Sequence, residues 1–84
     1  MEDIFEIIGK EDVSLIDLIG CIDLVKERGD VFVLKADGER EIKGYTVFIS
    51  RVGIEGDMIR SDSDDLKAAI LSVLKCYVSA ESPE

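Results

Sequence analysis

The sequence predicts an α+β protein in which a small three-stranded antiparallel sheet carries two main helices on one face, in the order α-β-β-β-α. Two observations predict this class. Apolar residues recur at helical spacing in two stretches, residues 14–29 and 66–77. Between them lie three short β-rich runs separated by turns that contain glycine. Two helices that flank such a meander pack most simply on the same face of its sheet.

The chain is expected to form a single domain over residues 1–84. Its 84 residues would divide into two pieces too small to bury separate cores. A hydrophobic content of 46% is too high for a disordered chain, even at a net charge of −9. Residues 1–10 are expected to form a short helix or an edge strand, and residues 80–84 a frayed tail.

The first main helix is predicted to begin after Ser14, with Asp17 completing a capping box that is one methylene short of the ideal, and to end at Gly29. Its apolar residues cover more than the face that a half-buried helix needs. Five of them form an apolar stripe at helical spacing, Leu15, Leu18, Ile19, Ile22 and Val25. Three more widen this stripe, Ile16, Cys21 and Leu24. The excess width indicates a second contact for this helix.

The sheet is predicted to start at Val31 and to turn at residues 36–40, with Gly38 at positive φ. The return strand runs from about Glu41 or Tyr45 to Val52, and period-two alternation places Tyr45 and Phe48 on opposite sides of it. We expect Tyr45 to be the exposed one of the two. A third strand over residues 57–61 follows, and then a helix with Asp64 and Asp65 in its first turn.

The composition argues against catalysis and against a cofactor. The sequence has no histidine and no tryptophan, and it lacks a nucleophile motif and a phosphate-binding glycine loop. Acidic residues gather at Asp57, Asp62, Asp64 and Asp65, but the EF-hand spacing is not met. Helix capping explains this cluster better than a metal does, so we expect neither a metal nor a cofactor.

Compartment and partner are both inferred from charge and cysteine usage. Cys21 and Cys76 lie in helical patterns and are expected to be buried thiols, as in a cytoplasmic protein, with a disulfide as the alternative. The amino terminus is acidic, unlike a signal peptide, and no apolar run is long enough to span a bilayer. A net charge of −9 repels nucleic acid and anionic membranes and favours a partner protein with a basic surface.

The binding surface is predicted on the sheet, with an apolar centre and carboxylates at the turns. Lys35, Arg40, Lys43 and Arg51 also belong to the hairpin, so the surface is mixed and favours a protein partner over mimicry of DNA. Solvated turns of an acidic protein are the alternative explanation for each carboxylate. The predicted partner-binding residues are Asp37, Glu39, Glu41, Tyr45, Val47, Glu55 and Asp57.

The layout of the chain also resembles known groups of proteins. A helix ends near residues 26–29, a hairpin spans residues 31–49, and a final helix starts at residues 64–69. This order resembles the small α/β sandwich proteins of bacteriophages and prophages, and the helix–sheet–helix plan of small acidic anti-CRISPR proteins. The resemblance implies a phage-encoded inhibitor that occupies the basic, nucleic-acid-binding surface of a host defence protein. A toxin-neutralising immunity protein and a structural or regulatory homodimer are the alternatives.

Overall fold

The computed structural model describes residues 2–52 and 58–81, with side chains up to residue 79. It confirms the α+β class, with a three-stranded antiparallel sheet and a short additional helix at the start of the chain. The elements are α1 (Glu2–Ile8), α2 (Leu15–Glu27), β1 (Val31–Ala36), β2 (Tyr45–Ser50), β3 (Met58–Ser63) and α3 (Leu66–Glu81).

Helix α2 begins and ends where the sequence predicts. The Ser14 side chain accepts a hydrogen bond from the Asp17 backbone N–H, and the Asp17 carboxylate accepts one from the Ser14 N–H, both at 3.1 Å. The capping box is therefore complete despite its short acidic member. The bonds from the Ser14 backbone and hydroxyl lower the pKa of Asp17 below its usual value. At the other end, Gly29 adopts a φ of +91°, which a residue with a side chain rarely takes.

The strands lie in the order β1-β2-β3, and each pair is antiparallel. Val47 of β2 is paired with Leu34 of β1 and with Ser61 of β3. Because side chains alternate along a strand, every second residue shares a face with Val47. We call this the inner face. We call the opposite side the outer face, and its strand residues are Val31, Val33, Lys35, Thr46, Phe48, Ser50, Met58, Arg60 and Asp62.

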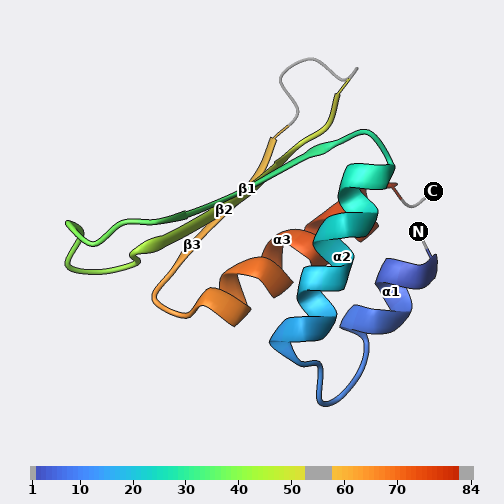
Figure 1. Ribbon diagram of the computed structural model, residues 1–84, viewed down its shortest axis with the longest axis horizontal. Helices are drawn as coiled ribbons and strands as arrows, with labels where there is room; N and C mark the ends of the chain where they lie inside the picture. The colour runs from blue at the N-terminus through green and yellow to red at the C-terminus, as the bar shows by residue number, and fades with distance from the viewer. Residues whose placement is uncertain (1, 53–57, 82–84) are drawn as a thin grey trace.

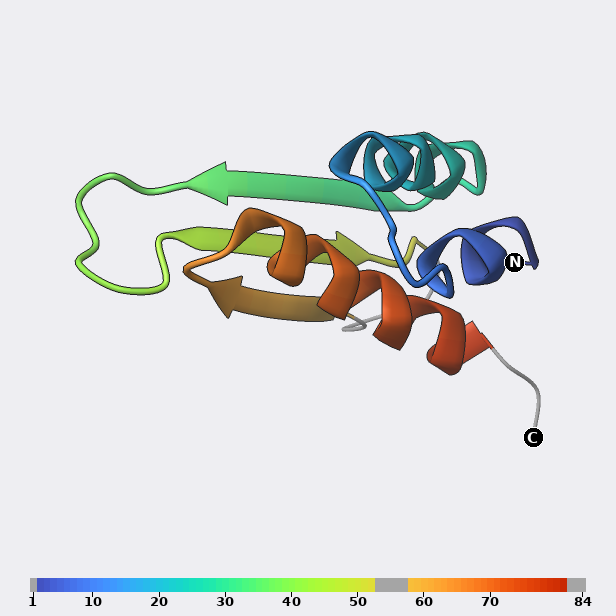
Figure 2. The ribbon, with the colours of Figure 1, turned by 90° about the horizontal axis from the view of Figure 1, so that it is seen from below.

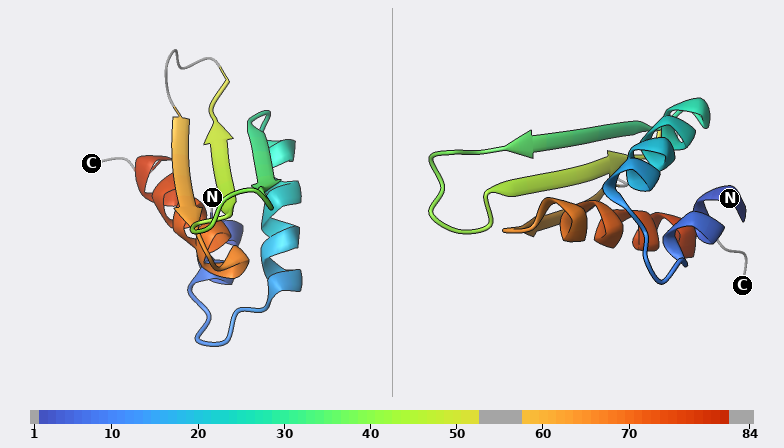
Figure 3. Two further views of the ribbon diagram at one scale, coloured as in Figure 1. Left: turned by 90° about the vertical axis from the view of Figure 1, so that its left-hand side faces the viewer. Right: turned by 60° about the horizontal axis from the view of Figure 1, so that its bottom comes forward.

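The helices lie on the inner side of the sheet (Figures 1 and 2). Helix α3 contacts β2 and β3, whereas α2 contacts β1 and both other helices. Figure 3 shows α2 alongside β1 and α3 alongside β3. The core forms between them and contains Ile4, Ile8, Val13, Leu18, Cys21, Val25, Val47, Ile49, Ala69, Ile70, Val73, Leu74 and Tyr77. In the described part of the chain, no helix covers the outer face (Figure 1).

The hairpin between β1 and β2 differs from the predicted turn. Its loop extends over residues 37–44, and the residue with positive φ is Lys43, at +52°, rather than Gly38. The Asp64 carboxylate accepts a hydrogen bond from the Lys43 backbone N–H, which holds the loop against the end of β3. An Asx turn at Asp37, whose side chain accepts a bond from the Glu39 N–H, closes the first half of the loop.

The start of α3 also lies later than predicted. Strand β3 continues to Ser63, and the helix begins at Leu66. Asp65 precedes the helix and accepts hydrogen bonds from the N–H groups of Lys67 and Ala68, at 3.0 and 3.3 Å. It is therefore an N-cap rather than a residue of the first turn.

The two cysteines are free, but their surroundings differ. Cys21 is buried in the core, where burial raises the pKa of its thiol, whereas Cys76 is exposed on α3. The prediction that both thiols are buried is wrong for Cys76. None of the described helices combines the length and apolar character that crossing a membrane requires.

Candidate protein-binding surface

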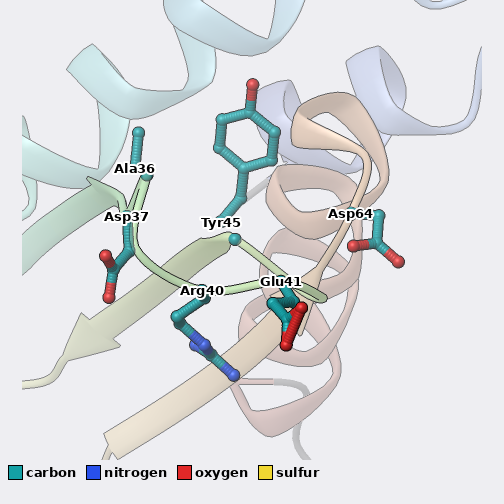
Figure 4. A pocket seen from close by; sticks show the side chains of 8 residues that line it. Ala36, Asp37, Arg40, Glu41, Tyr45 and Asp64 are labelled. Carbon is teal, nitrogen blue, oxygen red and sulfur yellow. The ribbon is translucent and has the colours of Figure 1, made fainter.

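Three of the predicted partner-binding residues lie together at the hairpin end. Asp37, Glu41 and Tyr45 line an open pocket of about 290 Å³, which Asp64 borders from the start of α3. Figure 4 shows the Tyr45 ring directed away from the side chains of Arg40 and Glu41. The polar groups of this pocket therefore do not converge on one point, as those of a specific ligand site do.

Two of the predicted aromatic and apolar positions were assigned to the wrong side of the sheet. Val47 is completely buried in the core and cannot contact a partner. Tyr45 shares the inner face with Val47 and is partly buried, whereas Phe48 lies on the outer face. The prediction that Tyr45 faces solvent and Phe48 faces the helices is therefore wrong, because the two residues lie on the opposite faces from those predicted. Glu39 and Glu41 are exposed on the loop, and Glu55 and Asp57 lie outside the described residues.

Helix α2 presents a set of exposed apolar side chains that the core does not use. Ile16 is 80% exposed and Ile19 is 56% exposed, and Leu15 is also exposed. Positions three and four apart are neighbours on a helix, so these three side chains form one patch. Because Leu18, Cys21 and Val25 face the core, the patch points away from it. The excess apolar width noted in the sequence corresponds to this patch.

Carboxylates border the patch at both ends of the helix. Asp23 lies one turn after Ile19, and Glu27 lies one turn after Asp23. Glu11 and Asp12 precede the helix, and all four side chains are exposed. We call Leu15, Ile16 and Ile19 with these four carboxylates the α2 surface.

Most of the net negative charge lies in the amino-terminal segment that contains α1 and α2. Residues 2–27 contain eight of the nineteen acidic residues but two of the ten basic residues. They account for two thirds of the net charge in less than a third of the chain. The net charge is therefore concentrated on the segment that contains α1 and α2.

The outer face carries a different set of charges, centred on Asp62. The Thr46 hydroxyl donates a hydrogen bond of 2.6 Å to the Asp62 carboxylate. Arg60 Nε and Arg40 Nη1 also donate to this carboxylate, at 3.2 and 3.3 Å. The Thr46 hydroxyl, then Arg60, and then Arg40 lower the pKa of Asp62 to about 2.

Replacing Asp62 with asparagine is expected to destabilise the protein near neutral pH, because Arg40 and Arg60 lose their anionic partner. The folded pKa lies below the ordinary value of 3.8, so this stabilisation is complete above about pH 4 and is lost as the pH falls toward 2. Urea denaturation of wild type and Asp62→Asn at a series of pH values should show the stability difference shrinking over this range.

The companion variant Thr46→Val removes the largest contribution to that shift. The Asp62 carboxyl should then titrate at a higher pH, as followed by NMR. A stability difference that stays constant from pH 5 to about pH 2, with an unchanged Asp62 titration in Thr46→Val, would contradict this account.

Neither a metal site nor a relative identifies the function. Within residues 2–52 and 58–81, no three acidic or cysteine side chains lie close enough together to hold a metal ion. No protein-family model, no curated protein sequence and no solved structure matches the chain. The function is therefore inferred from the surfaces of the molecule.

Proposed function

We propose that this protein is a non-catalytic binding protein whose α2 surface attaches to a basic surface of another protein. The observation that carries the proposal is the exposure of Ile16 and Ile19 next to the exposed carboxylates of α2. Apolar patches surrounded by charged residues are typical of sites that bind proteins. The carboxylates favour a partner with the opposite charge, because complementary potentials speed association and exclude other partners.

The rigid support of α2 adds to this proposal. The capping box fixes its first turn, and Leu18, Cys21 and Val25 anchor it in the core. A surface on an anchored helix needs little ordering when a partner binds, so more of the contact energy remains as affinity.

The partner that we propose is the basic, nucleic-acid-binding surface of a host defence protein, as the layout of the chain suggests. Surfaces that bind phosphate backbones present many lysine and arginine side chains, which α2 would meet with Asp23 and Glu27. Added DNA or RNA should then compete with this protein for its partner. An immunity protein that neutralises a basic toxin uses the same chemistry.

We expect the double variant Ile16→Ser with Ile19→Ser, named the helix variant, to bind the partner at least about tenfold more weakly than wild type. Both side chains are exposed, so the variant should fold like wild type. Immobilised wild type and helix variant are compared for the proteins that each retains from a host lysate and for the salt concentration that elutes them. Proteins held by wild type should be absent from the helix variant and should elute as salt rises.

The matched control also replaces two exposed aliphatic side chains with serine, but at positions outside α2. Ile42→Ser with Val52→Ser replaces two side chains exposed to 66% and 65%, and this control should retain the same proteins as wild type. Equal retention by wild type and the helix variant, or retention that resists salt, would refute the proposal.

A further inference from the structure

The outer face of the sheet is a second uncovered surface, and its charge is opposite to that of the chain as a whole. Lys35 lies at its hairpin end, Arg60 lies in its middle, and Arg40 reaches it from the hairpin loop. These three cations stand against two carboxylates, Asp62 and Asp37, the second of which pairs with Lys35 at 3.9 Å. The apolar end of this face contains Val31, 46% exposed, and Met58, 54% exposed. Cations and exposed apolar side chains thus lie side by side on this face.

The α2 surface is the chemical complement of the outer face. It offers exposed apolar side chains next to carboxylates, whereas the outer face offers exposed apolar side chains next to cations. Their lengths also agree, because the 13 residues of α2 and the 6 residues of each strand both extend about 20 Å. We propose that the outer face of one copy of this protein receives the α2 surface of a second copy.

The arrangement would complete a third layer on the sheet. Helix α3 covers the inner face of β2 and β3, and α2 of the second copy would cover the outer face in the same manner. The contact joins two different surfaces, so it is head-to-tail and leaves one unused surface at each end of the pair. Further copies can therefore add to the assembly.

Local charges decide this contact, despite the net charge of −9 on each copy. At physiological ionic strength, exposed charges more than about 8 Å apart are largely screened from one another. The α2 carboxylates that meet cations of the outer face would lie within that range across the interface, whereas the distant carboxylates would not. Self-association would cover the α2 surface, so a basic partner and a second copy compete for it.

The test mixes two variants that each lose one surface. The helix variant, Ile16→Ser with Ile19→Ser, keeps an intact outer face. The sheet variant, Lys35→Glu with Arg60→Glu, keeps an intact α2 surface. All four side chains are exposed, and circular dichroism and thermal unfolding check that both variants fold. Lys67→Glu with Lys75→Glu makes the same charge change on α3 and serves as the control.

Sedimentation equilibrium over a range of protein concentrations measures the outcome. Wild type and the α3 control should self-associate beyond a dimer, and each variant alone should remain monomeric. An equimolar mixture of the two variants should form a 1:1 heterodimer and nothing larger, because one complementary pair of surfaces survives in it. No partner protein is needed, so the result is independent of the proposed function.

Three results would overturn the proposal. Wild type could remain monomeric at millimolar concentration, or the mixture of variants could remain monomeric. The helix variant alone could still dimerise, which would indicate that two outer faces pack against each other in a symmetric pair.

Discussion

Replacing Val47 with aspartate is expected to leave the protein unfolded at 25 °C. Val47 lies in the central strand, between Leu34 and Ser61, and its side chain is completely buried against the helices. A carboxylate there would lie among the apolar side chains of the core, and burying a charged group without an ionic partner costs at least several kcal/mol. Domains of this size are stable by only about 5–15 kcal/mol, so this cost consumes much or all of the stability.

Two companion variants give the experiment its control. Val31→Asp introduces the same change at an exposed position of the outer face and should leave the protein folded. Val47→Ala removes two buried methyl groups and should lower the free energy of unfolding by about 2 kcal/mol. Far-ultraviolet circular dichroism and urea denaturation measure all three. A folded Val47→Asp protein with nearly wild-type stability would show that this position does not belong to the core.

The error over Val47 and Tyr45 has a physical origin in the pattern of β2. Alternation separates the residues of a strand into two sets, but it does not say which set faces the helices. In β2 both sets contain apolar and aromatic residues, so composition gives no decision. The register between β2 and β3 shows which set faces outward, because Thr46 is paired with Asp62 and Phe48 with Arg60. Those charged partners mark the outer face, and the sequence does not reveal the pairing.

The local signals of the chain were much more informative. Ser14 and Gly29 predicted the ends of α2, because a cap and a left-handed glycine depend on neighbouring residues only. The excess apolar width of α2 corresponds to the exposed side chains of Leu15, Ile16 and Ile19, and the second contact that it predicts stays a prediction. Which of its residues remain exposed depends on how α1, α3 and β1 pack against it, and this packing is a tertiary property.

One carboxylate ties together three segments that are far apart in the sequence. Asp30 lies between α2 and β1, and it accepts a hydrogen bond of 2.6 Å from the Tyr77 hydroxyl of α3. Its other oxygen accepts a bond of 3.1 Å from the backbone N–H of Val52, after β2. Asp30 therefore joins the end of α2 to α3 and to the segment after β2. The Tyr77 hydroxyl is the side-chain group that donates to it.

Replacing Tyr77 with phenylalanine is expected to lower the free energy of unfolding at pH 7 by about 2 kcal/mol, because the bond it removes ends on a charged group. Burial, followed by the bond to Asp30, raises the pKa of Tyr77 from 10 to about 12. Between these values the unfolded chain loses the phenolic proton while the folded protein keeps it. The stability of wild type should therefore fall by up to about 1.4 kcal/mol per pH unit above pH 10 through this group.

The phenylalanine variant has no phenol to titrate, so its stability should fall less steeply over the same range. The two stability curves, measured by urea denaturation from about pH 8 to pH 11.5, should consequently converge as the pH rises. Tyr45→Phe, which leaves the bond between Tyr77 and Asp30 intact, should keep the steep alkaline loss of wild type. Parallel curves for wild type and Tyr77→Phe would mean that the Tyr77 hydroxyl is not held as a donor in the folded protein, and that Asp30 joins α2 to β2 without α3.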